Sequence, residues 1–219
     1  MWKGWMFLGI SSSLDELNEY LRVTEELLVR AKDDFDARVD KETKGLSEEE
    51  LEELDLGDTY SEDYWRYTEE FPKILRSSLL VTAFSAFEHS LGVLCERLQS
   101  DKHIPIGLNI LKGDILERLK NYFKLTGLAI SYNNKRWQEL SDYSMVRNCI
   151  VHNNGLVKGF ADEVRLRNYA NKNGIIGQSP MEDEIVLTKE FCSRVIRTMI
   201  AFMKQVHDAY WAGKSASPA

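Results

Sequence analysis

The residues best suited to acid–base chemistry in this chain lie close together in MVRNCIVHNNG, at positions 145 to 155. Arg147 carries a fixed charge and a planar set of donors that fit phosphate oxygens. Histidine, here His152, is the side-chain type best suited to proton transfer near neutral pH. Asn148 follows the arginine and offers an amide that can orient the histidine or a bound anion. We therefore take Arg147, Asn148 and His152 as candidate catalytic residues.

A carboxylate that could support this group lies in a second apolar segment, FSAFEHS, which contains Glu88. A carboxylate in an apolar setting normally needs a partner. Arg147 is one candidate partner, and such a pair would either be purely structural or would position the guanidinium for catalysis. His152 could in turn be an ordinary residue of a helix end, so the residue types alone leave these alternatives open.

Hydrophobic residues recur at helical spacing through most of the chain. We expect helices from about 13 into the thirties, at 72–99, within 111–127, at 134–153 and from 189 onward. Ser13 with Glu16, and Ser47 with Glu50, have the form of capping boxes, and Thr188 can cap the last helix. The pattern predicts an all-α fold: an antiparallel, up-and-down helical bundle with an acidic inter-helix segment and a long C-terminal helix.

The spacing of the arginine and the histidine places a condition on any site they share. On a regular helix, residues five positions apart are separated by about 140° around the axis and about 7.5 Å along it. Arg147 and His152 therefore do not share one face. Either the helix distorts near Asn153 and Asn154, or a second copy of the helix completes the site across a two-fold axis.

Charge is distributed unevenly along the chain, whose net charge is −7. Residues 33–70 contain 16 acidic and 4 basic residues, whereas the rest of the chain contains 24 basic and 19 acidic residues. The rest of the chain is thus compatible with a polyanionic partner. We expect a single helical domain, 1–219, divided into an N-terminal helix with a mobile acidic connection (1–70), a bundle core (70–211) and a disordered tail (212–219).

Several classes of protein are disfavoured by composition. Cys95, Cys149 and Cys192 show no CxxC spacing, and the four histidines are dispersed, so we expect neither a disulfide framework nor a zinc site and assign no cofactor or metal. No apolar run approaches the roughly 20 residues of a membrane span, and the N-terminus lacks a signal-peptide pattern. We therefore expect a cytoplasmic protein without a membrane partner.

The segment RNCIVH resembles the Arg-polar-x3–5-His signature of the HEPN superfamily, and FSAFEHSLGVLCERL is similar to the family's apolar helix that bears a glutamate. EIVLTKEF followed by a long apolar helix also fits, so the resemblance covers about residues 70–211. It implies a metal-independent endoribonuclease, a homodimer whose two Arg–His pairs line one cleft, and a toxin–antitoxin or phage-defence role with a neutralising protein partner as one form of control. Some family members are regulated by nucleotide transfer onto a tyrosine two residues after the histidine, but this chain has Asn154 there.

The acidic segment motivates a different hypothesis. A stretch with a net charge of −12 is an unusual neighbour for an RNA cleft unless it masks that cleft. The alternative function is a non-catalytic helical module that binds a nucleotide or a partner protein, in the manner of an antitoxin.

Overall fold

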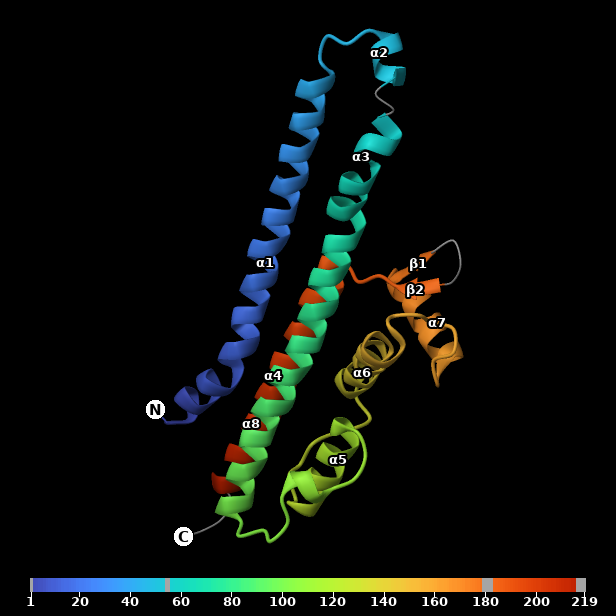
Figure 1. Ribbon diagram of the computed structural model, residues 1–219. Helices are drawn as coiled ribbons and strands as arrows, with labels where there is room; N and C mark the ends of the chain where they lie inside the picture. Colours follow the sequence, from blue (N-terminus) through green and yellow to red (C-terminus); the bar gives the residue numbers. More distant parts are fainter. Residues whose placement is uncertain (1, 54–55, 179–182, 216–219) are drawn as a thin grey trace.

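The computed structural model describes residues 2–53, 56–178 and 183–215, and in these ranges the chain is mostly helical. Its main bundle consists of α1 (Trp2–Thr43), α4 (Phe71–Asp101), α6 (Lys135–Asn153) and α8 (Lys189–Ser215). In Figure 1, α1 runs opposite to α4 and α8, and α6 is viewed nearly end-on beside them. The predicted fold class, an all-α antiparallel bundle, is confirmed.

Buried aromatic side chains fill the centre of this bundle. The rings of Phe87 on α4 and Phe202 on α8 lie 6.0 Å apart between centroids, and both side chains are almost fully buried. Tyr143 on α6 meets Phe191 on α8 edge to face at 5.6 Å. Because large rings contribute much of the apolar area that a domain buries, these contacts connect α4, α6 and α8 through one core.

Shorter elements connect the long helices, and side-chain caps mark the first turns of two of the long helices. They are the 3₁₀ turn η2 (Leu108–Ile110), α5 (Ile115–Leu125), α7 (Glu163–Asn173), β1 (Ile176–Gln178) and β2 (Asp183–Ile185), with the two strands antiparallel. The side chain of Asn134 accepts from the backbone N–H of Trp137 at 2.9 Å and caps α6. Thr188 caps α8 in the same way, by accepting from the N–H of Phe191 at 3.1 Å.

The acidic segment is more helical than the sequence suggested. Within the described residues it contains the end of α1, then α2 (Glu48–Glu53) and α3 (Leu56–Trp65), so the segment is helical there, and its mobility stays a prediction. The Ser47–Glu50 capping box is present, since the N–H of Ser47 donates to Glu50 at 2.7 Å and the N–H of Glu50 donates to the Ser47 hydroxyl at 3.3 Å. The Ser13–Glu16 box is wrong, because α1 already runs from Trp2.

The C-terminal tail also differs from the expectation. Helix α8 continues through Ser215, so the expected disorder is wrong for residues 212–215. The last part of the expected tail, 216–219, lies outside the described residues.

Helix α4 is the main part of one long, apolar helix. Helix α3, the π-helical segment η1 (Arg66–Glu70) and α4 follow one another without a break, and Pro72 lies in the first turn of α4. Among the described residues, Tyr60–Asp101 is the one helix long and apolar enough to cross a membrane by length and composition, which the sequence analysis did not expect. Half of its most apolar stretch is buried inside the structure.

A buried ion pair joins the N-terminal helix to this central helix. Nε and Nη2 of Arg76 on α4 donate to the two carboxylate oxygens of Glu25 on α1, at 2.7 and 2.9 Å, and Glu25 is only 7% exposed. The bond with Glu25 raises the pKa of Arg76 above its ordinary value, against the opposing effect of burial. Arg76 Nη1 also donates to the carbonyl of Leu187 at 3.2 Å, which ties both helices to the segment before α8.

This pair gives a prediction about stability. We expect Glu25→Ala to lower the free energy of unfolding by about 3–5 kcal/mol, because it leaves the Arg76 charge buried without its partner. Glu26→Ala is the matched control, since the Glu26 side chain is 48% exposed and pairs with Arg22 on the surface. That change should cost less than about 1 kcal/mol. Urea unfolding of both variants checks the prediction, and equal losses would contradict it.

Candidate active site

The three candidate catalytic residues lie in the last two turns of α6. The helix is regular from Lys135 through Asn153, which confirms the predicted range of 134–153 to within one residue. Its buried side faces the bundle through Leu140, Tyr143, Val146 and Cys149. Packing of these residues therefore fixes the rotation of α6 and decides which way Arg147, Asn148 and His152 point.

The end of α6 is built from residues that suit a left-handed turn. Asn154 (φ 52°) and Gly155 (φ 79°) both have positive φ, and the N–H of Gly155 donates to the carbonyl of Cys149 at 3.1 Å. Asparagine and glycine tolerate this conformation best. The Asn153 amide donates to the carbonyls of Leu156 and Lys158, at 2.5 and 3.0 Å, and holds the following turn. Asn153 and Asn154 thus terminate the helix without distorting it.

Strand β2 holds this turn in place. The N–H of Ile185 donates to the carbonyl of Gly155 at 2.8 Å, and the N–H of Val157 donates to the carbonyl of Asp183 at 3.0 Å. Glu184, which lies between Asp183 and Ile185 on β2, forms an ion pair at 2.8 Å with Lys73 near the start of α4. The C-terminal end of α6 is therefore anchored both to the strand and, through it, to the central helix.

Arg147 is half-buried and is not paired with a carboxylate among the described residues. Its Nη1 donates to Oδ1 of Asn148 at 2.9 Å, and its Nε is buried without a hydrogen-bond partner in the described part of the chain. A guanidinium that is partly removed from water normally finds an anion. The charge of Arg147 is therefore available to an anionic ligand.

His152 lies one turn beyond Asn148 on the same face of α6, because residues four apart are neighbours on a helix surface. Its side chain is exposed and makes no hydrogen bond or ion pair within the described residues. Asn148 is thus adjacent to both Arg147 and His152. Because α6 stays regular through Asn153, the first of the two alternatives, a distortion that brings Arg147 and His152 onto one face, is not what the helix adopts.

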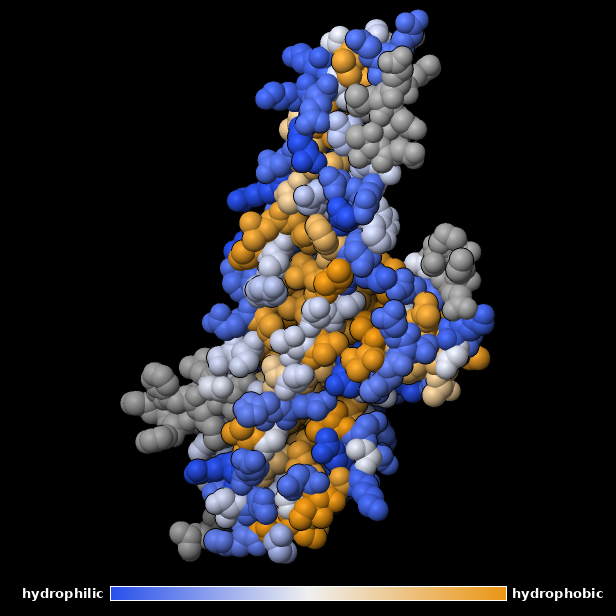
Figure 2. Space-filling model, viewed as in Figure 1, coloured by the Kyte–Doolittle hydropathy of each residue, from blue (hydrophilic) through white to orange (hydrophobic). Residues whose placement is uncertain are grey.

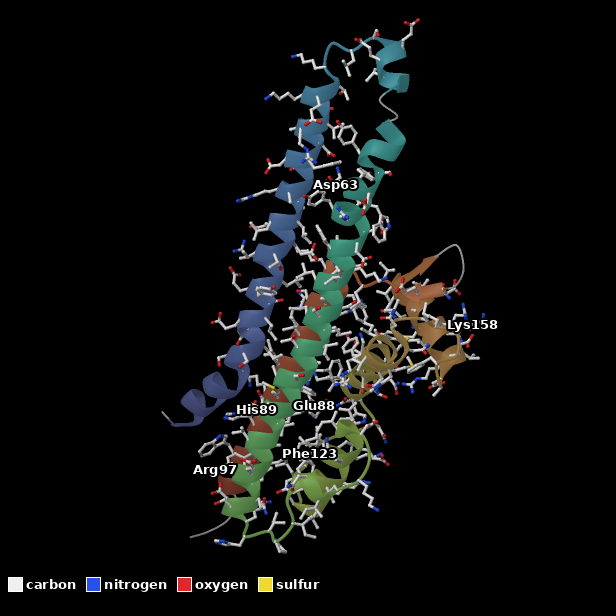
Figure 3. The ribbon with its side chains drawn as sticks, in the orientation of Figure 1. Asp63, Glu88, His89, Arg97, Phe123 and Lys158 are labelled. Atoms are coloured by element: carbon white, nitrogen blue, oxygen red, sulfur yellow. The ribbon has the colours of Figure 1, made fainter. Side chains whose placement is uncertain are left out.

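Glu88 is placed on α4 in a half-buried position, and in the described part of the chain no hydrogen bond or ion pair links it to Arg147. Figure 3 shows Glu88 on the side of α4 toward Phe123 of α5, with His89 on another side of the helix. The purely structural Glu88–Arg147 pair is therefore not formed within one chain. A supporting role for Glu88 stays a prediction.

A shallow cavity of about 380 Å³ opens beside Asn148. Helices α5, α6 and α7 and the turn before α7 contribute its walls, which include Lys120, Ser141, Ser144 and Arg165. Ser144 is only 8% exposed, and its hydroxyl makes no hydrogen bond among the described residues. Arg165 donates to Asp142 at 2.6 Å and to Ser141 at 3.3 Å, which holds α7 against α6. Asn148 is the candidate catalytic residue that lines this cavity.

Sequence reasoning did not find this cavity, because its residues come from segments that no local pattern connects. Ser144 and Asn148 are four apart on one helix, which is a visible signal, but Lys120 and Arg165 reach the cavity only through tertiary packing. In the described part of the chain, no three His, Cys, Asp or Glu side chains gather as a metal-binding group.

The acidic segment does not cover the end of α6. In Figure 1 the hairpin of α1 with α2 and α3 extends past the body of the bundle, and its tip lies apart from α6. Masking of the motif by the acidic segment therefore does not occur within one chain in this arrangement.

Comparison with known proteins adds no relative: no family model, curated protein or solved structure matches this chain.

The cysteine inside the motif gives a prediction. Burial, and secondarily the Glu184 carboxylate, raise the pKa of the Cys149 thiol to about 11, and burial raises the pKa of Cys95 and Cys192 to about 12. At pH 8 only about one Cys149 thiol in a thousand is then ionised. We expect the folded protein to resist iodoacetamide while free cysteine reacts fully, and the urea-unfolded chain to take up three alkyl groups. Rapid labelling of native Cys149, read by mass spectrometry, would contradict this.

Proposed function

We propose that this protein is a metal-independent endoribonuclease of the HEPN type that acts in the cytoplasm as a toxin or in defence against phage. The observation that carries the proposal is the state of Arg147. This half-buried guanidinium has no carboxylate partner in the described chain and donates to Asn148, which lies one turn from the exposed His152 near the fixed end of the helix. The resemblance of RNCIVH to the family signature supports the same conclusion.

The chemistry follows from what RNA cleavage through the 2′-hydroxyl requires. The 2′-oxygen loses a proton as it attacks the adjacent phosphorus, the 5′-oxygen gains a proton as its bond to phosphorus breaks, and the products carry a 2′,3′-cyclic phosphate and a 5′-hydroxyl. One imidazole can accept the first proton and a second can donate the other. Arg147 donates to the phosphate oxygens, whose negative charge increases in the transition state.

A homodimer supplies the second imidazole in this proposal. Arg147 and His152 point to different sides of one regular helix, so a single copy presents the two groups apart. A two-fold axis beside the end of α6 would place two arginines and two histidines around one phosphate. Asn148 would orient His152, or bind the phosphate through its Nδ2, since its Oδ1 already accepts from Arg147.

A second candidate function is a non-catalytic interaction module. It is favoured by the acidic hairpin, which extends from the bundle and carries most of the chain's excess negative charge. Intact RNA after incubation with purified protein, together with tight binding of a partner protein, would favour this function over the nuclease.

The nuclease proposal predicts the effect of two substitutions. We expect the purified protein to cleave total RNA or tRNA in excess EDTA, and His152→Ala to reduce the rate by about 10²- to 10⁴-fold through loss of proton transfer. Arg147→Ala should reduce it by about 10²- to 10³-fold through loss of transition-state charge stabilisation. Single-turnover cleavage of a labelled tRNA measures both, after circular dichroism has confirmed folding.

Matched controls come from the same chain. His89 and Arg197 are exposed residues on α4 and α8, away from the motif in sequence, and their alanine variants should cleave RNA within about twofold of the natural protein. Cleavage that survives His152→Ala and Arg147→Ala would indicate a contaminating nuclease and contradict the proposal. Equal losses in the control variants would also contradict it.

A further inference from the structure

The acidic arm, defined as residues 33–70, contains a groove that the proposed nuclease activity does not use. The groove lies between the end of α1 and α3, has a volume of about 570 Å³, and is lined by Phe35, Asp36, Val39, Asp40, Tyr60, Ser61 and Tyr64. Figure 1 shows the arm as a two-helix hairpin that extends beyond the bundle. Two antiparallel helices without a third leave such a groove open to solvent.

The groove combines aromatic walls with carboxylates at helical spacing. Asp36 and Asp40 are one turn apart on α1, and Tyr60 and Tyr64 are one turn apart on α3. Phe35, which is 5% exposed, lies behind them and packs against Tyr60 with ring centroids 6.3 Å apart. The hydroxyl of Tyr60 donates to Glu42 at 2.6 Å, so this ring is held in place.

Two cationic side chains of this protein already contact aromatic rings of the groove. Lys32 Nζ lies 5.6 Å from the centroid of the Tyr64 ring and pairs with Asp36 at 2.5 Å. The Arg38 guanidinium lies 5.3 Å from the centroid of the Phe35 ring. Both distances are within the range at which a cation is attracted to the face of an aromatic ring. The groove thus suits lysine or arginine side chains.

A carboxylate and exposed aromatic surface in and beside the groove are available to a further partner. The Asp40 carboxylate makes no ion pair or side-chain hydrogen bond among the described residues. The side chains of Tyr64 and Trp65 are each 51% exposed. The arm has 16 acidic but only 4 basic residues, so most of its carboxylates cannot be neutralised within the arm. Exposed aromatic surface beside excess negative charge is complementary to a partner that is both apolar and basic.

We propose that the groove between α1 and α3 docks a basic amphipathic helix of a partner protein. A lysine or arginine of that helix would pair with Asp40, and a second one turn away would share Asp36 with Lys32. An apolar residue on the same face would pack between Tyr60 and Tyr64. RNA and anionic lipid surfaces are disfavoured here, because the arm repels negative charge. In Figure 2 the tip of the arm is mainly hydrophilic, and hydrophobic surface gathers along the α1–α4 seam below it, which is a second groove that the test must distinguish.

The proposal does not depend on the nuclease activity and is tested by binding alone. The probe is a fluorescein-labelled helical peptide of about 18 residues, made from lysine, leucine and alanine with lysines at i and i+4 on the leucine face. A second peptide carries glutamate in place of every lysine. Fluorescence anisotropy with the full-length protein gives the dissociation constants. The lysine peptide should bind and the glutamate peptide should not.

Two matched pairs of variants separate groove binding from general attraction to an acidic surface. The double variant Asp36→Asn/Asp40→Asn should weaken binding of the lysine peptide by about tenfold or more. The control, Asp33→Asn/Asp34→Asn, removes the same charge from exposed positions of α1 and should weaken binding by less than about threefold. Tyr64→Ala should weaken binding by about tenfold, whereas Tyr20→Ala, an equally exposed tyrosine that lines another groove between α1 and α4, should not.

Several results would overturn the proposal. Equal losses in the two aspartate variants would mean diffuse attraction to the arm, and a larger loss from Tyr20→Ala would place the peptide in the α1–α4 groove. A failure of the natural protein to bind the lysine peptide would overturn it directly. Light scattering that shows Tyr64→Ala converting a dimer to a monomer would instead assign the groove to a second copy of this chain.

Discussion

The buried pair of Glu25 and Arg76 is the interaction on which the arrangement of this protein depends. It joins α1 to α4 in a setting with little access to water, and Arg76 also holds the carbonyl of Leu187 before α8. The neighbouring strand β2 is held by the same end of α4 through Lys73 and Glu184, and it carries the hydrogen bonds that fix the end of α6. A contact between the first and central helices therefore helps determine where the candidate catalytic residues lie.

The regular geometry of α6 limits how the candidate catalytic residues can act together. Because the helix continues undistorted to Asn153, Arg147 and His152 stay on different sides of it, and Asn148 is the residue adjacent to both. In the proposed nuclease, a second copy of the chain therefore completes the site around one phosphate. The end of α6 presents Arg147 and the cavity beside Asn148, while the acidic arm extends away from it. The proposed RNA site and the proposed docking groove for a basic helix therefore lie at different places on the chain.

Much of the fold and the local structure of the site could be predicted from the sequence. The limits of α6, the caps at Asn134 and Thr188, and the turn at Asn154 and Gly155 follow from local rules that the sequence displays directly. The helical order in the acidic segment could not be predicted from its composition, because it depends on the Arg38–Asp63 ion pair and on packing of Phe35 against Tyr60 and Tyr67 across the hairpin. The cavity beside Asn148 was hidden for the same reason, since three helices supply its walls. Local patterns also could not predict whether Glu88 pairs with Arg147. The apolar residues around Glu88 suggest that its carboxylate needs a partner, but they do not identify that partner.

The most direct test of the central claim is the chemistry of cleavage at a single ribose. A short RNA that the protein cuts should be compared, in excess EDTA, with the same RNA carrying one 2′-O-methyl group on the nucleotide before the cleavage site, and the product ends should be read by mass spectrometry. Attack by the 2′-oxygen predicts a 2′,3′-cyclic phosphate and a 5′-hydroxyl from the unmodified RNA, and no cleavage at the methylated position. Products with a 5′-phosphate, or cleavage that continues past the 2′-O-methyl group, would contradict the account.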